Sequence, residues 1–116
     1  MKTTLKLIVA ASLLFSAGAY ADNAGLSLAQ KNACMSCHGV DKKIVGPGYN
    51  DVANKYRDKE YLKKMGYKDT KAVEAYLVDK VKKGGAGVWG TIPMPPNPQV
   101  KDEDLHTIVK WVLSLK

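Results

Sequence analysis

Apolar side chains recur at helical spacing near the C-terminus of the chain. From Asp102 to Leu115 they are three or four positions apart, which places them on one face of a helix. Acidic residues fill the first turn, where they suit the helix dipole. The pattern predicts a C-terminal amphipathic helix that Asp102 caps. Its apolar positions are Leu105, Ile108, Val109, Trp111, Val112 and Leu115.

Three further segments show helical patterns. One runs through residues 71–83, with Thr70 as its expected cap and Gly84 at its end. A shorter one covers residues 50–56, and Ser27 is expected to cap another that leads into the cysteines. No run alternates β-branched and aromatic residues as a strand does. The sequence therefore predicts an all-α fold of three to five helices.

The long loop before the last helix is unusually rigid. Four of the five prolines of the chain fall within six positions, residues 93–98. Proline excludes helix and central strand here, so the segment forms a stiff extended strap. Such a strap presents one side chain in a fixed place, and the residue within it is Met94.

The N-terminus has the order of a secretory signal peptide. Lys2 and Lys6 precede an apolar run over residues 7–17, and Ala19-Tyr20-Ala21 reads as a cleavage site. The run is too short to cross a bilayer, which needs about 20 residues. We expect a signal peptide over residues 1–21, one domain over residues 22–116, and a periplasmic location. The alternative is a buried N-terminal helix.

The charge of the chain is moderately basic. The net charge is +7, and loss of Lys2 and Lys6 with the signal peptide leaves 16 basic against 11 acidic residues, or +5. This favours a lysine-rich solvated surface or an acidic partner. No basic stripe is interleaved with aromatic residues, so no nucleic acid partner is expected. We also expect a monomer that is not an integral membrane protein.

The sequence Cys34-Met35-Ser36-Cys37-His38 is the C-x-x-C-H pattern of covalent haem attachment. Two thiols at this spacing match the two vinyl groups of a haem, and the next residue is placed to bind the iron. Cys34 and Cys37 would form thioethers, and His38 would be the proximal ligand. The motif therefore predicts one haem c per chain.

Three other interpretations of the motif are open. A thioredoxin-type redox pair needs a preceding strand, which the sequence does not offer. A zinc site needs four ligands, for which His106 would have to join the motif. A disulfide across two residues would stabilise little.

The sixth iron ligand has four candidates: Met35, Met65, Met94 and His106. Met35 lies inside the attachment loop, on the wrong side. Met65 belongs to a charged surface stretch and is expected to pack partly in the core, and His106 to sit half-exposed on the last helix. Prolines hold only Met94, so we expect it to be the distal ligand rather than a core gap-filler.

Residues 24–116 resemble the short bacterial class I cytochromes c, the group typified by cytochrome c-551. The resemblance is carried by C-x-x-C-H at 34–38, Val-Gly-Pro at 45–47, Gly-Val-Trp-Gly at 87–90, Ile-Pro-Met-Pro-Pro-Asn at 92–97 and a closing helix with Trp111. It implies an all-α fold around one haem and a role as a one-electron carrier rather than an enzyme. The chain departs from the group in residues 57–67, which look longer and more charged, and in Lys101, where a capping serine is common.

The resemblance also implies roles for four other residues. The carbonyl of Pro47 would accept a hydrogen bond from His38. Trp89 would lie against the haem and reach a propionate, and Asn97 would help orient the methionine sulfur. Trp111 would pack where the first and last helices cross.

The function expected from these residues is electron transfer between larger respiratory proteins. Donors and acceptors of this kind include a bc-type complex, a terminal oxidase or a nitrite reductase. Lysines at positions 42, 43, 82 and 83 are expected to steer docking. The alternatives are a haem enzyme or gas sensor with an open iron position, and a thiol oxidoreductase without haem.

Overall fold

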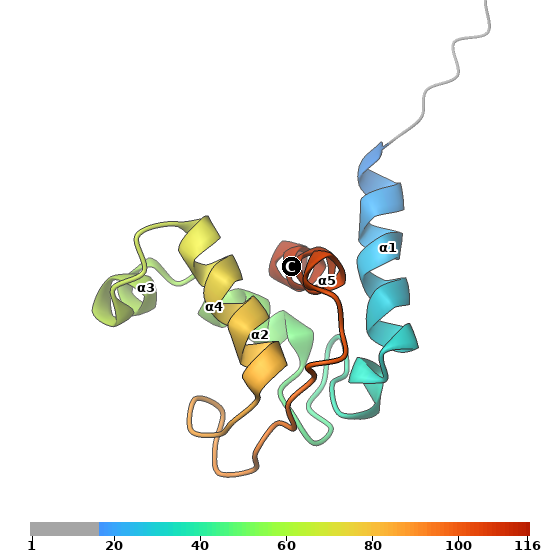
Figure 1. Cartoon of the computed structure of the whole chain (residues 1–116). Helices are drawn as coiled ribbons and strands as arrows, with labels where there is room; N and C mark the ends of the chain where they lie inside the picture. The colour runs from blue at the N-terminus through green and yellow to red at the C-terminus, as the bar shows by residue number, and fades with distance from the viewer. Residues whose placement is uncertain (1–16) are drawn as a thin grey trace, which may run out of the picture.

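The computed structural model describes residues 17–116, and the all-α prediction is confirmed (Figure 1). In this part of the chain there are five α-helices and no strand beyond isolated bridges. Their bounds are α1 (Ala17–Lys31), α2 (Tyr49–Lys55), α3 (Lys59–Met65), α4 (Thr70–Lys83) and α5 (Asp102–Ser114), with a 3-10 turn η1 (Cys34–Ser36) after α1. None of the helices described is long and apolar enough to cross a membrane.

The predicted signal peptide falls largely outside this part. Residues 1–16 are not among those described, and the expected cleavage site at residues 19–21 lies within α1. Ser27 does not cap a helix, because α1 begins ten residues before it. The residues preceding Ser27 are rich in alanine, the best helix former, so the helix continues through them.

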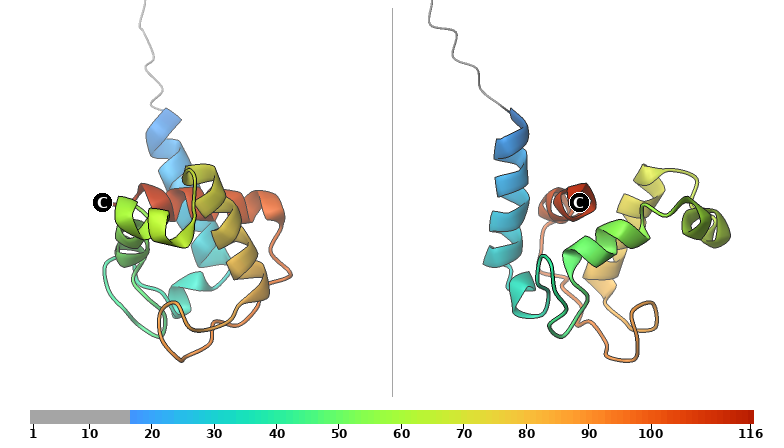
Figure 2. Two further views of the ribbon diagram at one scale, coloured as in Figure 1. Left: turned by 90° about the vertical axis from the view of Figure 1, so that its left-hand side faces the viewer. Right: turned by 180° about the vertical axis from the view of Figure 1, so that it is seen from behind.

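Helices α1 and α5 cross in close contact, and the two views of Figure 2 show α1 running across α5. Gly25 lies at the crossing. A Cβ there would overlap the Cβ of Trp111 and lie 2.6 Å from its Cγ, so only glycine allows this approach. Trp111 is buried, with 7% of its surface exposed. Its predicted place at the helix crossing is confirmed.

The core has two parts, and α5 contributes residues to both. The apolar face predicted for α5 is buried, apart from the half-buried Leu115. One cluster joins α1, α2, α4 and α5, and the other lies between α4 and the start of α5. The first contains Ala29, Tyr49, Val52, Tyr56, Val73, Ile108, Trp111 and Val112. The second contains Val78, Val100, Leu105 and Val109.

Two expected helix caps are wrong. Asp69, not Thr70, caps α4, and its carboxylate accepts a hydrogen bond from Ala72 N at 2.8 Å. Aspartate is the stronger capping residue. Asp102 lies in the first turn of α5, and Lys101 takes the cap position without a side-chain hydrogen bond. The three acidic residues there act on the helix dipole instead.

The charged stretch at residues 57–67 contains α3, which the sequence interpretation missed. Asp58 caps it by accepting hydrogen bonds from the backbone of residues 60 and 61, and Gly66 ends it at φ 79°. Tyr61 and Leu62 pack on the first core cluster. Met65 is 51% exposed, so its expected core packing is wrong. In Figure 1, α4 lies between α3 and α1.

Candidate functional site

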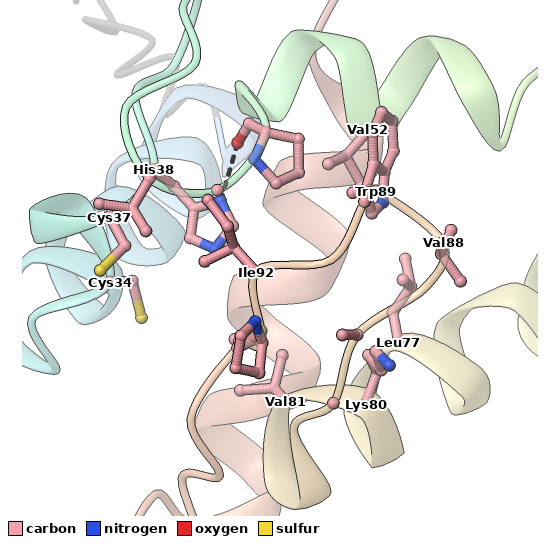
Figure 3. Close-up of a pocket in the computed structure, with 18 of the residues that line it drawn as sticks. Cys34, Cys37, His38, Val52, Leu77, Lys80, Val81, Val88, Trp89 and Ile92 are labelled. Carbon is pink, nitrogen blue, oxygen red and sulfur yellow. Dashed lines mark hydrogen bonds between the residues drawn. The ribbon is translucent and has the colours of Figure 1, made fainter.

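A cavity of about 350 Å³ lies between η1, the loop at residues 43–49, helices α4 and α5, and the proline strap (Figure 3). Most of the side chains around it are apolar. Its walls include Cys34, Cys37, His38, Val45, Lys80, Trp89, Ile92 and Met94. The three segments that carried the sequence motifs therefore meet at one cavity.

Cys34, Cys37 and His38 form one tight turn at this cavity. Ala33 takes a left-handed conformation (φ 61°), which turns the chain from α1 into η1. The backbone nitrogens of Cys37 and His38 both donate to the carbonyl of Cys34, at 3.2 and 3.0 Å. Figure 3 shows both cysteines beside His38 at the same end of the cavity.

Neither cysteine is in a disulfide. Burial raises the pKa of the Cys34 thiol above its ordinary value, and a hydrogen bond with Tyr49 opposes this only in part. The redox-active thiols of C-x-x-C enzymes have a lowered pKa. The environment of Cys34 therefore does not suit a thiol oxidoreductase.

The imidazole of His38 is buried, with 8% of its surface exposed. Its Nδ1 lies 2.8 Å from the carbonyl oxygen of Pro47, which is the hydrogen bond that the resemblance implied. A carbonyl only accepts, so Nδ1 carries a proton in this hydrogen bond, and in the neutral ring Nε2 is the nitrogen that keeps a lone pair. His38 is thereby prepared as a neutral metal ligand through Nε2.

The proline strap is held against the end of α4. Met94 and Gly85 exchange two backbone hydrogen bonds, at 2.9 and 3.0 Å. The backbone nitrogen of Asn97 donates to Val81 at 3.0 Å, and its side-chain amide donates to Pro95 at 3.0 Å. The strap is therefore fixed on both sides of Met94, which is half-buried and lines the cavity. Asn97 therefore donates hydrogen bonds to backbone carbonyls, and its expected role in orienting the Met94 sulfur stays a prediction.

Trp89 lines the cavity and is 40% exposed. The ammonium of Lys55 lies 4.7 Å from the centre of its ring and 4.6 Å from that of Tyr61. This cation–π pair connects the loop before the strap to α2 and α3. The expected contact of Trp89 with a haem propionate stays a prediction.

The sequence interpretation missed two residues of the site. Tyr49 begins α2 and stacks on His38, with ring centres 4.8 Å apart and planes 14° apart. The sequence pattern puts Lys80 on the apolar face of α4, and its half-buried side chain lines the cavity. Lys80 could have been found from the sequence, because a charged residue on an otherwise apolar helix face indicates a functional position. Nothing in the sequence pattern marked Tyr49.

The lining of the cavity suits a large apolar group with acidic substituents. Val45, Trp89 and Ile92 line it although 40–62% of their surface is exposed, so an apolar ligand would cover them. Lys80 supplies a cation at its wall. Two thiols for covalent attachment and two donors for iron, His38 and Met94, complete a donor set of the kind used for haem.

The other predicted ligands lie elsewhere. His106 is on α5, where its Nδ1 lies 2.7 Å from a carboxylate oxygen of Glu74. It does not line the cavity, and residues 17–116 contain no group of three or more histidine, cysteine or acidic side chains placed to hold a metal. The zinc interpretation therefore has no site here. Met35 packs on the first core cluster, and Met65 lies on the surface of α3.

Comparison with known proteins gives one consistent result. A sequence profile of the cytochrome c family matches residues 23–116. Cytochrome c-552 of Nitrosomonas europaea is 45% identical over 116 residues, the full length of both chains. Cytochrome c-551 of Pseudomonas aeruginosa is 39% identical over 94% of this chain and 92% of its own. The crystal structure of the Nitrosomonas europaea protein covers 78% of this chain and 99% of its own, with a TM-score of 0.66.

The chain belongs to the cytochrome c family, and it is a bacterial class I c-type cytochrome. Proteins of this family carry a covalently attached haem c, and the single C-x-x-C-H motif at residues 34–38 fits one such group. The chain is therefore a monohaem electron carrier and not an enzyme.

Proposed function

We propose that the chain is a periplasmic carrier that moves single electrons between respiratory redox proteins. In this proposal Cys34 and Cys37 bind the haem covalently, and His38 and Met94 are its two axial ligands. Pro47, Trp89 and Asn97 hold the ligands and the haem in place.

One observation carries the proposal. His38 and Met94 line the same cavity, and each is held by backbone hydrogen bonds that leave its donor atom free. Nδ1 of His38 is occupied by the Pro47 carbonyl, and the strap is fixed at Gly85. Two prepared donors in one cavity favour a six-coordinate site over one that keeps a position open for a substrate.

The bound haem iron supplies a reversible one-electron change between its ferric and ferrous states. The chain determines how easily that change occurs. With haem bound, the apolar walls would exclude water, and the sulfur of Met94 would favour the ferrous state relative to a second histidine. Lys80 offers a positive charge to an acidic substituent of the haem.

Export fits thioether formation, because the thiols must be delivered outside the cytosol to the haem-attachment machinery. We propose cleavage after Ala21. The family match begins at residue 23, two residues further on, which supports this boundary. The partners in this compartment would be proteins such as a bc-type complex, a terminal oxidase or a nitrite reductase.

The proposal is tested by expressing the full chain in a bacterium with haem-attachment machinery and measuring the intact mass of the periplasmic product. We expect residues 22–116 plus one haem that acidified organic solvent does not extract. Cys34→Ala and Cys37→Ala should each weaken or abolish attachment, whereas Ser36→Ala, which leaves both thiols intact, should not. Haem that is freely extracted, or a product that stays in the cytosol, would contradict the proposal.

A further inference from the structure

The ring of His38 is contacted from three directions, of which its hydrogen bond is one. Gly46 lies against a face of the ring, where a Cβ would come 2.6 Å from Cε1, 3.0 Å from Nδ1 and 3.1 Å from Nε2. Tyr49 covers one face, with the rings nearly parallel at 14°. The stack therefore limits the tilt of the ring plane, which the hydrogen bond to Pro47 alone leaves free.

A single hydrogen bond fixes the direction of the N–H group but not the plane of the ring. The imidazole can still rock about the line from Nδ1 to the Pro47 oxygen. A parallel aromatic ring 4.8 Å away opposes that motion, because tilting the imidazole would drive its edge into the tyrosine. The plane of His38 thus depends on Tyr49.

Tyr49 is itself held firmly enough to act in this way. Only 7% of its surface is exposed, and Trp111 packs edge-on against it, with ring centres 5.5 Å apart and planes at 84°. Its backbone nitrogen donates to Gly39, the residue after His38, at 2.9 Å. The α1–α5 crossing at Trp111 is therefore connected through one side chain to the ring of His38.

We infer that Tyr49 is a positioning residue that sets the plane of the His38 imidazole at the iron. This inference rests on the proposed ligation by His38. The inference goes beyond that ligation, because it assigns the orientation of the His38 imidazole to the aromatic ring of Tyr49 and not to the tyrosine hydroxyl group.

The test compares three variants of the holoprotein by electron paramagnetic resonance of the ferric form and by proton NMR of the haem methyl groups. Both spectra report the orientation of the axial ligand planes. Tyr49→Phe keeps the ring and should keep the wild-type g-values and methyl pattern. Tyr49→Leu keeps an apolar side chain but removes the stack, and should shift both.

Tyr56→Leu is the matched control, because Tyr56 is also buried with 7% exposed, but it packs among Tyr61, Tyr67 and Tyr76 instead of on His38. It should lower stability while leaving both spectra unchanged. Unchanged spectra in Tyr49→Leu, or an equal shift in Tyr56→Leu, would overturn the inference. A wild-type ferric protein without low-spin histidine–methionine signals would instead contradict the proposed ligation itself.

Discussion

Gly84 packs directly against the backbone of Met94. A Cβ on Gly84 would overlap the Met94 carbonyl oxygen and lie 2.8 Å from the nitrogen of Pro96. Gly84 also has φ 68° and ψ −158°, a conformation that is essentially restricted to glycine. The end of α4 and the strap that carries the proposed ligand therefore meet at a position where no side chain fits.

Gly84→Ala is expected to displace the strap and to lower the free energy of unfolding by about 3 kcal/mol, from backbone strain and overlap together. Gly87→Ala is the control. Gly87 also has a positive φ, of 115°, but a Cβ added there would meet no atom within 4 Å, so this variant should lose only about 1–2 kcal/mol. Urea unfolding measures both. Equal losses in the two variants would show that the contact with the strap contributes nothing.

Met94→Ala is expected to erase the weak near-infrared sulfur-to-iron band of the oxidised protein and to lower the reduction potential. Met65→Ala removes a methionine that is half exposed on α3, and it should change neither property. Near-infrared absorption and voltammetry of both variants provide the measurement. A band that survives in Met94→Ala would assign the ligand to another methionine.

Stability is expected to fall at alkaline pH, in part through Tyr56. Burial, together with the neighbouring Tyr76, raises the pKa of Tyr56 above its ordinary value. The unfolded chain then loses this proton near pH 10 while the folded chain retains it, so stability decreases as the pH rises above about 10. Unfolding midpoints between pH 8 and 11 should decline less steeply in Tyr56→Phe. If the unfolding midpoint of Tyr56→Phe declines with pH as steeply as that of the wild type, Tyr56 does not contribute to the alkaline loss of stability.

The lysines expected to steer docking do not have equivalent surroundings. Lys82 and Lys83 form ion pairs with Asp102 and Asp79. Lys42 and Lys43 are exposed, and Lys43 lines the cavity.

Neutralising Lys42 and Lys43 to glutamine is therefore expected to slow electron transfer to a redox partner several-fold at low salt and to flatten its salt dependence. The same change at Lys82 and Lys83 should have less effect. Stopped-flow oxidation of the reduced protein over a range of ionic strength measures this. A wild-type rate that does not fall with added salt would contradict steering by charge.

The sequence predicted those parts of the molecule whose chemistry is local. The attachment motif, the proline strap and the apolar face of α5 depend on neighbouring residues, and each was found where expected. Helix α3 was missed because its apolar contacts are few, although Asp58 and Gly66 mark its ends. Tyr49 could not have been assigned, because its stack on His38 depends on how the chain folds back to bring the start of α2 beside His38 in three dimensions.

The central claim is that both axial positions of the iron are filled, by His38 and Met94. Carbon monoxide binding to the native ferrous protein at neutral pH tests this most directly. Among the described residues, the cavity lining contains no histidine other than His38 and no arginine, and His106 is engaged with Glu74 away from the cavity, so no distal histidine or arginine prepares a site for a small ligand. We predict that carbon monoxide binds negligibly to the native protein and readily to Met94→Ala. Rapid binding to the native protein, with a five-coordinate spectrum before the gas is added, would contradict the carrier assignment.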